Sequence, residues 1–501
     1  MLNETMRPVL SRVLTVTLLA VVLLAATFSQ AVPKTVMVHY MPWFVSQPYS
    51  GSWGWHWTMN YFNPNTINPT NGEQEIASWY YPLIGPYDSA DPAVLEYHVL
   101  LMKLSGIDGA IVDWYGMDSF NDYAISNART VDLFNYTHKA GLKFSLCYED
   151  STIAQEIRGG FITAAGAIAH AQQTMLYAQS NFFSDPSFLR WKTLPVLLNF
   201  GPQYFTSSSV WVSNFSVLNM TNQPAFFTED NRLTPVGTGA FDWPPMSLSR
   251  TNAQSPVEPV LSDAALNGYL ASFDQKAGSW PALVSSAFPR YHDIYAQAGT
   301  QASLGCLDDQ DGATFQETLT RAMTNASTYV QVVTWNDFGE GTIVEPTVQY
   351  GYRDLGVIQN FRRQYLDADF PFQTNDLLLA LRQYNLRKQY GTTNLVLSAE
   401  LDRVFTNIIS TNLTAAALEL TGLESNVPVI YDASAAGGQL QFSIGGFLFG
   451  SGIQVQKSPN RAAGAWQTVA TLSVGTNLMV FSAPIPANSP AMFFKIQNAG
   501  P

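Results

Sequence analysis

Charged residues are scarce in this chain of 501 residues. Asp, Glu, Lys and Arg together make up 13% of it, against about 25% in an average soluble protein. The 25 basic side chains are outnumbered by 38 acidic ones and form no cluster, which argues against electrostatic capture of nucleic acid or of an anionic membrane. We therefore expect a neutral partner.

Cysteine is scarce as well, because only Cys147 and Cys306 are present. Two cysteines exclude a disulfide scaffold, and the sequence leaves open whether they are free or bridged. Compact metal-binding spacings such as H-E-x-x-H are missing too. The residue types that bind metals are instead scattered, at His39, His56, His98, Asp113 and Glu149. We expect neither a metal nor another cofactor.

An apolar run lies near the amino terminus. Arg7 and Arg12 precede residues 13–26, and small residues around Ala31 offer a cleavage site, which is the pattern of an export signal. The sequence predicts a signal peptide over 1–31 and a secreted protein that is free of the membrane after cleavage. The alternative is an uncleaved anchor, although the run is short for a span of about 20 residues.

Five N-x-S/T sequons are the candidate glycosylation sites of such an exported chain. They lie at Asn135, Asn214, Asn219, Asn325 and Asn412.

Short apolar runs alternate with helical periodicity over the first 370 residues. Candidate strands lie at 36–40, 109–114, 142–148, 194–200, 225–228, 282–286 and 330–335, and helices at 93–105, 125–140 and 311–326. This alternation predicts a parallel sheet closed into a (β/α)8 TIM-type barrel, within a domain of residues 32–372. No eighth strand is evident, and the polar segment 246–263 is expected to be a loop.

The pattern changes after residue 372. Helices are expected at 376–390 and 397–419, within a helical extension of residues 373–424, and short alternating strands at 439–444, 453–456 and 491–496. Residues 425–501 are therefore predicted to form a small β-sandwich accessory domain. Carbohydrate binding and structural attachment both remain open as its role.

The run from Tyr329 to Glu345 carries the clearest chemical signal. A buried strand ends there in Trp335, Asn336, Asp337, Gly339 and Glu340. In such barrels the active site lies at the carboxyl ends of the strands, and glycosidic bond cleavage needs a proton donor and a second carboxylate. We therefore predict that Asp337 and Glu340 are the catalytic pair of a sugar hydrolase.

Aromatic, histidine and acidic residues gather at the other strand ends and in the loop that follows the first strand. Flat aromatic rings suit the apolar faces of sugars, and carboxylates suit their hydroxyl groups. The candidate substrate-binding residues are Tyr40, Trp43, Trp55, His56, Trp57, Asp113, Trp114, Tyr115, Glu149, Trp335 and Asn336.

Four motifs resemble glycoside hydrolase family 99, the endo-acting α-mannosidases and α-mannanases, and its family-99-like relatives. They are VHYMPWF at 38–44, GWHW at 54–57, DGAIVDWYG at 108–116 and WNDFGEGTIVEP at 335–346. The resemblance covers about residues 34 to 370. It implies a barrel that needs no metal and cleaves within α-linked mannose-containing glycans with retention of configuration.

The family motif W-N-E-W-H-E-G-T implies the roles of the two carboxyl groups. Asp337 stands where the family has its first catalytic Glu and would deprotonate the sugar 2-hydroxyl, giving a 1,2-anhydro intermediate. Glu340 would protonate the leaving oxygen and then activate water. Glu149 falls near the Glu of the family's I-E-P-Y strand end, which implies a substrate contact, although Asp150 replaces the Pro.

Two other hypotheses remain. The form W-N-D-F-G-E also resembles glycoside hydrolase family 71, the fungal α-1,3-glucanases, which implies an inverting reaction on an α-glucan. Because Asp337 is one methylene shorter than the family 99 Glu, the chain is also compatible with a non-catalytic glycan-binding or surface structural protein.

Overall fold

The computed structural model describes residues 34–251, 258–390, 395–425, 427–445, 452–459, 465–473, 479–485 and 492–498. The predicted signal peptide lies outside these ranges. Within them, no helix has both the length and the apolar character needed to cross a bilayer.

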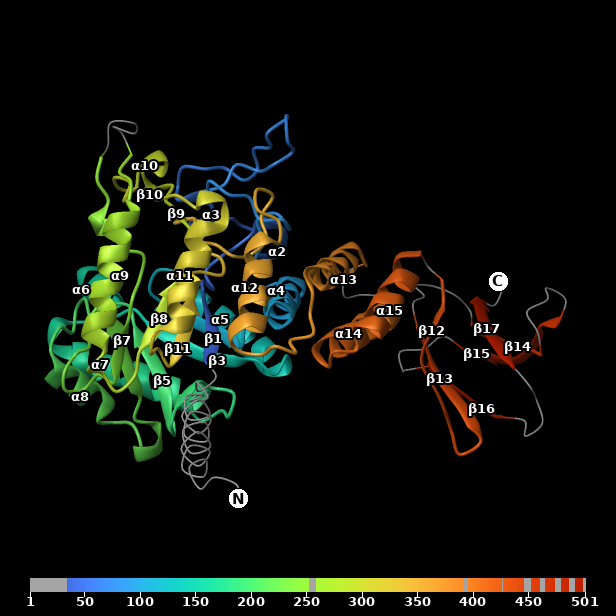
Figure 1. Cartoon of the computed structure of the whole chain (residues 1–501). Coiled ribbons are helices and arrows are strands. Elements are labelled where there is room, and N and C mark those ends of the chain that lie inside the picture. The colour runs from blue at the N-terminus through green and yellow to red at the C-terminus, as the bar shows by residue number, and fades with distance from the viewer. Residues whose placement is uncertain are drawn as a thin grey trace, which may run out of the picture. The chain divides into compact units, whose positions relative to one another are not determined.

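Eight parallel strands close into a barrel, which confirms the predicted fold (Figure 1). The strands are β1 (Thr35–Tyr40), β2 (Gly109–Trp114), β3 (Lys143–Tyr148), β5 (Leu194–Asn199), β6 (Ala225–Glu229), β7 (Gly239–Phe241), β8 (Val284–Ala287) and β11 (Tyr329–Val332). They pair in this order, and β11 pairs with β1 to close the ring. The strand that sequence reasoning missed is β7, whose three residues are too few to show a period.

The helices surround the barrel, with some short elements in the loops (Figure 1). The longer ones are α4 (Pro92–Ser105), α5 (Tyr123–Lys139), α6 (Ser151–Arg158), α7 (Ala167–Ala178), α8 (Ser208–Phe215), α9 (Asp263–Ala277), α11 (Ala313–Thr324) and α12 (Arg353–Tyr365). The short ones are α2 (Gln47–Ser50), α3 (Trp55–Thr58), α10 (Tyr295–Ala298), β4 (Arg190–Trp191), β9 (Tyr291–His292), β10 (Cys306–Leu307) and the helical turns η2 (Ala164–Gly166), η3 (Gln179–Phe183), η4 (Met220–Asn222), η5 (Met246–Leu248) and η6 (Gln310–Gly312).

Strand alternation divides the apolar residues between two clusters. On β1, Val36 and Val38 belong to the cluster between strands and helices, whereas Met37 belongs to the one inside the barrel. Because side chains alternate along a strand, His39 also faces the interior, at the carboxyl end. The same alternation directs Asp113 of β2 inwards. Polar groups thus cap an apolar barrel interior on its carboxyl side.

The predicted helical extension holds three helices and the turn η7 (Thr374–Leu377) that leads into them. The single helix expected at 397–419 is instead two, α14 (Leu395–Ile409) and α15 (Leu413–Ser425), because Thr411 between them has a positive φ of 67° that ends the first. The helix before them, α13 (Leu378–Tyr390), packs on α4, where Arg387 binds the buried Glu96.

The carboxy-terminal residues form two antiparallel sheets of three strands. One contains β12 (Val429–Ala436), β13 (Gln439–Gly445) and β16 (Met479–Pro484), and the other β15 (Gln467–Leu472), β14 (Ile453–Ser458) and β17 (Phe493–Asn498). Both sheets contribute to one apolar cluster, in which Phe442 contacts Phe494. Paired sheets around a shared core are the arrangement of the predicted sandwich, and its role stays a prediction.

Burial separates the five sequons. Asn214 is fully buried, so an oligosaccharide cannot be carried there in the folded protein. Asn135 and Asn219 are exposed, and Asn325 and Asn412 are half-buried, so glycosylation stays a prediction at these four positions. Both cysteines are free thiols.

Candidate active site

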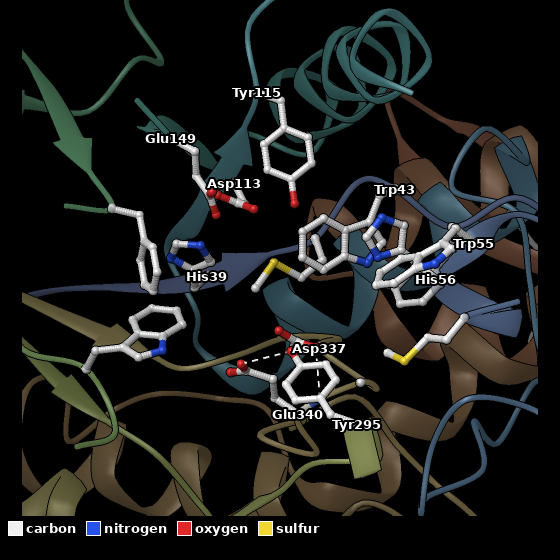
Figure 2. A pocket seen from close by; sticks show the side chains of 16 residues that line it. His39, Trp43, Trp55, His56, Asp113, Tyr115, Glu149, Tyr295, Asp337 and Glu340 are labelled. Carbon is white, nitrogen blue, oxygen red and sulfur yellow. Dashed lines mark hydrogen bonds between the residues drawn. The ribbon is translucent and has the colours of Figure 1, made fainter. Parts of the chain in front are cut away.

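A cavity opens at the carboxyl ends of the barrel strands (Figure 2). Eight of the predicted site residues line it: Trp43, Trp55, His56, Asp113, Tyr115, Glu149, Asp337 and Glu340. Figure 2 shows Asp113 and Glu149 on one side and Asp337 and Glu340 on the other. Four carboxyl groups from three strand ends therefore converge on one space.

The loop after β11 fixes the predicted catalytic pair. The Asp337 amide donates to Thr334 Oγ1 at 2.8 Å, and Asp337 Oδ1 accepts from the Glu340 amide at 3.1 Å. The Glu340 carbonyl accepts from the amide of His292 on β9 at 2.8 Å. The loop therefore places both carboxyl groups on rigid backbone, as catalysis requires.

Burial separates the acidities of this pair. It raises the pKa of Asp337 to about 6, against the lowering effect of the Glu340 and Gly339 amides. Burial and the charge of Asp337 raise the pKa of Glu340 to about 8, against the lowering effect of hydrogen bonds from Tyr295 and Tyr291. Near neutral pH Asp337 is then mainly ionised and Glu340 mainly protonated, which is the division that an acid and a base need.

The opposite wall is also acidic and poorly solvated. Burial raises the pKa of Glu149 to about 7, and burial with the charge of Glu149 raises that of Asp113 well above its usual value. His39, which lies between the two walls, has its pKa lowered to about 4 by burial and is therefore neutral. Such perturbed groups in one cleft mark a functional site.

Aromatic rings form one end of the cavity (Figure 2). Trp43 stacks on His56 with ring centroids 4.1 Å apart and also contacts Tyr115 at 5.8 Å. His56 Nε2 lies 3.4 Å from Asp122 Oδ2, which fixes the imidazole. Trp55, 42% exposed, extends this surface outwards.

Several lining residues were missed by sequence reasoning. They are Met41, Phe44, Met59, Phe200, Trp243, Tyr295 and Gly339. Trp243 follows the unrecognised strand β7 and packs edge-on against His39 and Phe200. Tyr295 donates to Glu340 Oε1 at 3.1 Å, and no local pattern links this residue to a strand end.

Five predicted substrate-binding residues do not line the cavity: Tyr40, Trp57, Trp114, Trp335 and Asn336. Tyr40 and Trp114 follow the inward-facing His39 and Asp113, so strand alternation turns them towards the helices. There Trp114 donates to Asn127 at 3.0 Å. Tyr40 and Trp114 were predicted to contact the substrate, whereas the structure gives them a role in packing between strands and helices.

The other three residues belong to the packing around the loop. The Trp57 indole donates to the Tyr87 carbonyl at 2.7 Å, and Trp335 packs against His98 with ring centroids 5.4 Å apart. The side chain of Asn336 binds both backbone groups of Met41, at 2.8 and 3.0 Å. It thereby ties the loop after β11 to the end of β1.

A polar network lies around Asn336, fully removed from solvent. Asn336 donates to the Tyr87 hydroxyl at 3.0 Å, and that hydroxyl donates to Glu345 Oε2 at 2.7 Å. The other Glu345 oxygen lies 3.2 Å from His98 Nε2, and Tyr40 bonds to His98 Nδ1 at 2.9 Å. We call Asn336, Tyr87, Glu345, His98 and Tyr40 the loop-supporting network.

Two further hollows adjoin the cavity. One shares the aromatic end and Glu149 and continues towards Tyr123 and Gln155. The other shares Phe200, Trp243 and Glu340 and continues towards Glu229 and Tyr269. The carboxyl pair therefore lies within a longer depression with room on more than one side.

Comparisons with known proteins point to one family. Glycoprotein endo-alpha-1,2-mannosidase of Mus musculus is 22% identical over 355 residues, covering 63% of this chain and 69% of the relative, and the Rattus norvegicus protein is 21% identical with the same coverage. The GH99 endo-alpha-mannosidase structure from Bacteroides thetaiotaomicron is 17% identical, with 67% of this chain and 97% of that chain covered and a TM-score of 0.46. A search with family models gives no match.

The sequence relatives are named as endo-alpha-mannosidases, which is the activity of the family that the four motifs resemble. The predicted resemblance is therefore confirmed as a similarity of this chain to glycoside hydrolases of the endo-α-mannosidase kind.

Proposed function

We propose that this protein cleaves internal α-mannosidic linkages of a glycan, with Asp337 as the base and Glu340 as the acid. One observation carries the proposal: the two carboxyl groups face one cavity with pKa values of about 6 and about 8. The names of the sequence relatives, endo-acting α-mannosidases, support the substrate class.

The proposed reaction retains configuration through a 1,2-anhydro sugar. Asp337 takes the proton of the 2-hydroxyl while that oxygen attacks the anomeric carbon, and the glycosidic bond breaks as Glu340 gives its proton to the leaving oxygen. Glu340 then takes a proton from water, which attacks the anomeric carbon. Asp337 returns its proton to the 2-oxygen, so both carboxyl groups end as they began.

The depression beyond the carboxyl pair supports internal cleavage. The hollow at the aromatic end and the one beyond Trp243 and Glu340 provide space for sugar units on different sides of the scissile bond. Trp43 and Trp55 offer flat faces for stacking, and Asp113 and Glu149 offer acceptors for hydroxyl groups.

We also propose that the chain acts outside the cell. The motif of Arg7, Arg12, the apolar run 13–26 and the small residues before 32 supports export. Exposed Asn135 and Asn219 are then the proposed glycosylation sites.

The test is hydrolysis by residues 32–501 of a panel of α-mannans and α-glucans, with products resolved by size and the first-formed anomer read by NMR. Internal fragments of mannan with the α configuration are expected. Products of inverted configuration from α-glucan would instead show the inverting α-1,3-glucanase reaction that resembles family 71. Binding without any product would make it a glycan-binding protein.

A further inference from the structure

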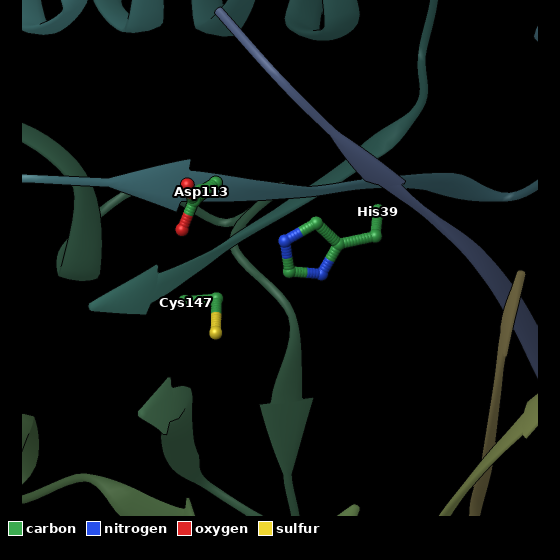
Figure 3. Close-up of side chains that lie close together, drawn as sticks. All are labelled: His39, Asp113 and Cys147. Carbon is green, nitrogen blue, oxygen red and sulfur yellow. The ribbon is translucent and has the colours of Figure 1, made fainter. Parts of the chain in front are cut away.

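Three potential metal ligands lie close together at the carboxyl ends of the strands (Figure 3). Two of them, His39 and Asp113, line the cavity. His39 of β1, Asp113 of β2 and Cys147 of β3 come from adjacent strands and all face the barrel interior. One ligand atom of each lies within 4.8 Å of the others, and all three residues are at least nine-tenths buried. We call them the floor trio.

The floor trio has an incomplete set of internal partners. His39 interacts with the side chain of Gln331, and backbone groups of Trp114 and Phe200 bond to Asp113 and Cys147. Asp113 Oδ1, however, is shielded from solvent and forms no hydrogen bond within the described part of the chain. Buried polar atoms without partners are uncommon and call for an explanation.

A second group of similar composition provides a contrast. His170 Nε2 lies 3.0 Å from Asp118 Oδ2 and 3.1 Å from Glu156 Oε2. These carboxylates raise the pKa of His170 to about 10, so an imidazolium neutralises them. His170 is therefore held by two ion pairs, whereas no ion pair of His39 is found among the described residues.

We propose that the floor trio binds one borderline-soft divalent cation such as Zn²⁺, with a fourth coordination position open to the cavity. Thiolate, imidazole and carboxylate are the three ligand types of zinc, and three protein ligands with an open position are the usual arrangement where the ion remains accessible. Bond lengths of about 2.0–2.3 Å put ligand atoms of one ion some 3–4 Å apart, so modest side-chain rotations bring the trio together.

Binding would affect two neighbouring groups. The Cys147 thiol must release its proton to solvent before sulfur can bind the ion. The cation would also lie beside Glu149, the charged group that acts most strongly on Asp113. If the proposed function holds, an ion there occupies the cavity floor and inhibits hydrolysis reversibly.

Cobalt(II) is the probe, because its thiolate complexes absorb in the near ultraviolet. Residues 32–501, reduced and freed of metal by a chelator, are titrated with Co²⁺. We expect a thiolate-to-cobalt band that saturates at a single equivalent and is displaced by Zn²⁺. The cobalt band is measured without substrate, so its presence or absence tests metal binding independently of the proposed glycosidase activity.

The two cysteines supply a matched control. Cys147→Ser should remove the band and Cys306→Ser should leave it unchanged, with unfolding temperature as the check on folding. Asp113→Asn should keep the band but weaken Co²⁺ affinity by about tenfold or more, and it tests the site if Cys147→Ser fails to fold. No band in the wild-type protein, or a band that depends on Cys306, would overturn the proposal.

Discussion

Carboxyl groups have opposite environments in the cavity and in the loop-supporting network: those of the cavity face open space, and that of the network is enclosed by hydrogen-bond partners. Asp337 and Glu340 have raised pKa values and face a space left for a substrate. Glu345, five residues after Glu340, is buried, accepts from Tyr87 and lies against His98. One motif therefore contains both the residues proposed to be catalytic and the residues that hold their loop in place.

The largest expected effect comes from the cavity side. Glu340→Gln removes the proposed acid, and such a group contributes about 10²- to 10⁴-fold to rate. We expect kcat on α-mannan to fall by that factor while glycan binding, measured by calorimetry, is kept. The unfolding temperature at pH 9 should not fall, because the raised pKa means that ionised Glu340 destabilises the fold. Unchanged hydrolysis would show that another group is the acid.

Trp57 and Trp55 lie two residues apart in the sequence, but we expect Trp57 to affect the stability of the fold and Trp55 to affect substrate binding. Trp57 is fully buried against Phe44 and Phe338, so Trp57→Ala should lower the free energy of unfolding by about 3–5 kcal/mol. Trp55→Ala should leave stability nearly unchanged and raise KM, with a loss of about 0.5–1.5 kcal/mol of binding. Chemical denaturation and steady-state kinetics measure the two effects, and equal destabilisation by both changes would contradict the comparison.

Glu345→Gln makes in the loop-supporting network the same change that Glu340→Gln makes in the cavity. Glu345→Gln leaves a similar shape but removes the charge that faces His98 and the strong acceptor of Tyr87. Unfolding free energy should fall by about 1–3 kcal/mol, read by chemical denaturation. Should Glu345→Gln instead match Glu340→Gln in losing activity at full stability, the network would have a chemical role.

The smallest expected effect is on pH dependence. The proposed pair predicts a bell-shaped kcat/KM, rising as Asp337 ionises near pH 6 and falling as Glu340 ionises near pH 8, both being properties of the coupled pair. The Tyr295 hydroxyl stabilises ionised Glu340, so Tyr295→Phe should move the alkaline limb towards higher pH. If the alkaline pKa of the profile does not change in Tyr295→Phe, then Tyr295 does not stabilise the ionised form of the group that acts as the acid.

Seven of the eight barrel strands could be predicted because each is an apolar run with polar or glycine boundaries. Three-residue β7 could not, and neither could the break at Thr411, where local conformation interrupts a helical pattern. Eight of the predicted site residues line the cavity because parallel strands share one carboxyl edge, whereas Met41, Phe200 and Trp243, which also follow strand ends, were not predicted. The errors at Tyr40 and Trp114 arose because proximity to a strand end was considered without the side-chain alternation that sends them outwards.

The sequence by itself determined the barrel, the acidic pair and the family resemblance, because periodicity, strand-end chemistry and motif spacing are local properties. Only the tertiary structure decided which motif residues face the cavity, that Tyr295 and Trp243 join it, and that Cys147 lies close to His39 and Asp113. Closing the sheet brings together strand ends that are up to 300 residues apart in the chain, and their mutual burial sets the pKa values on which the proposed chemistry depends.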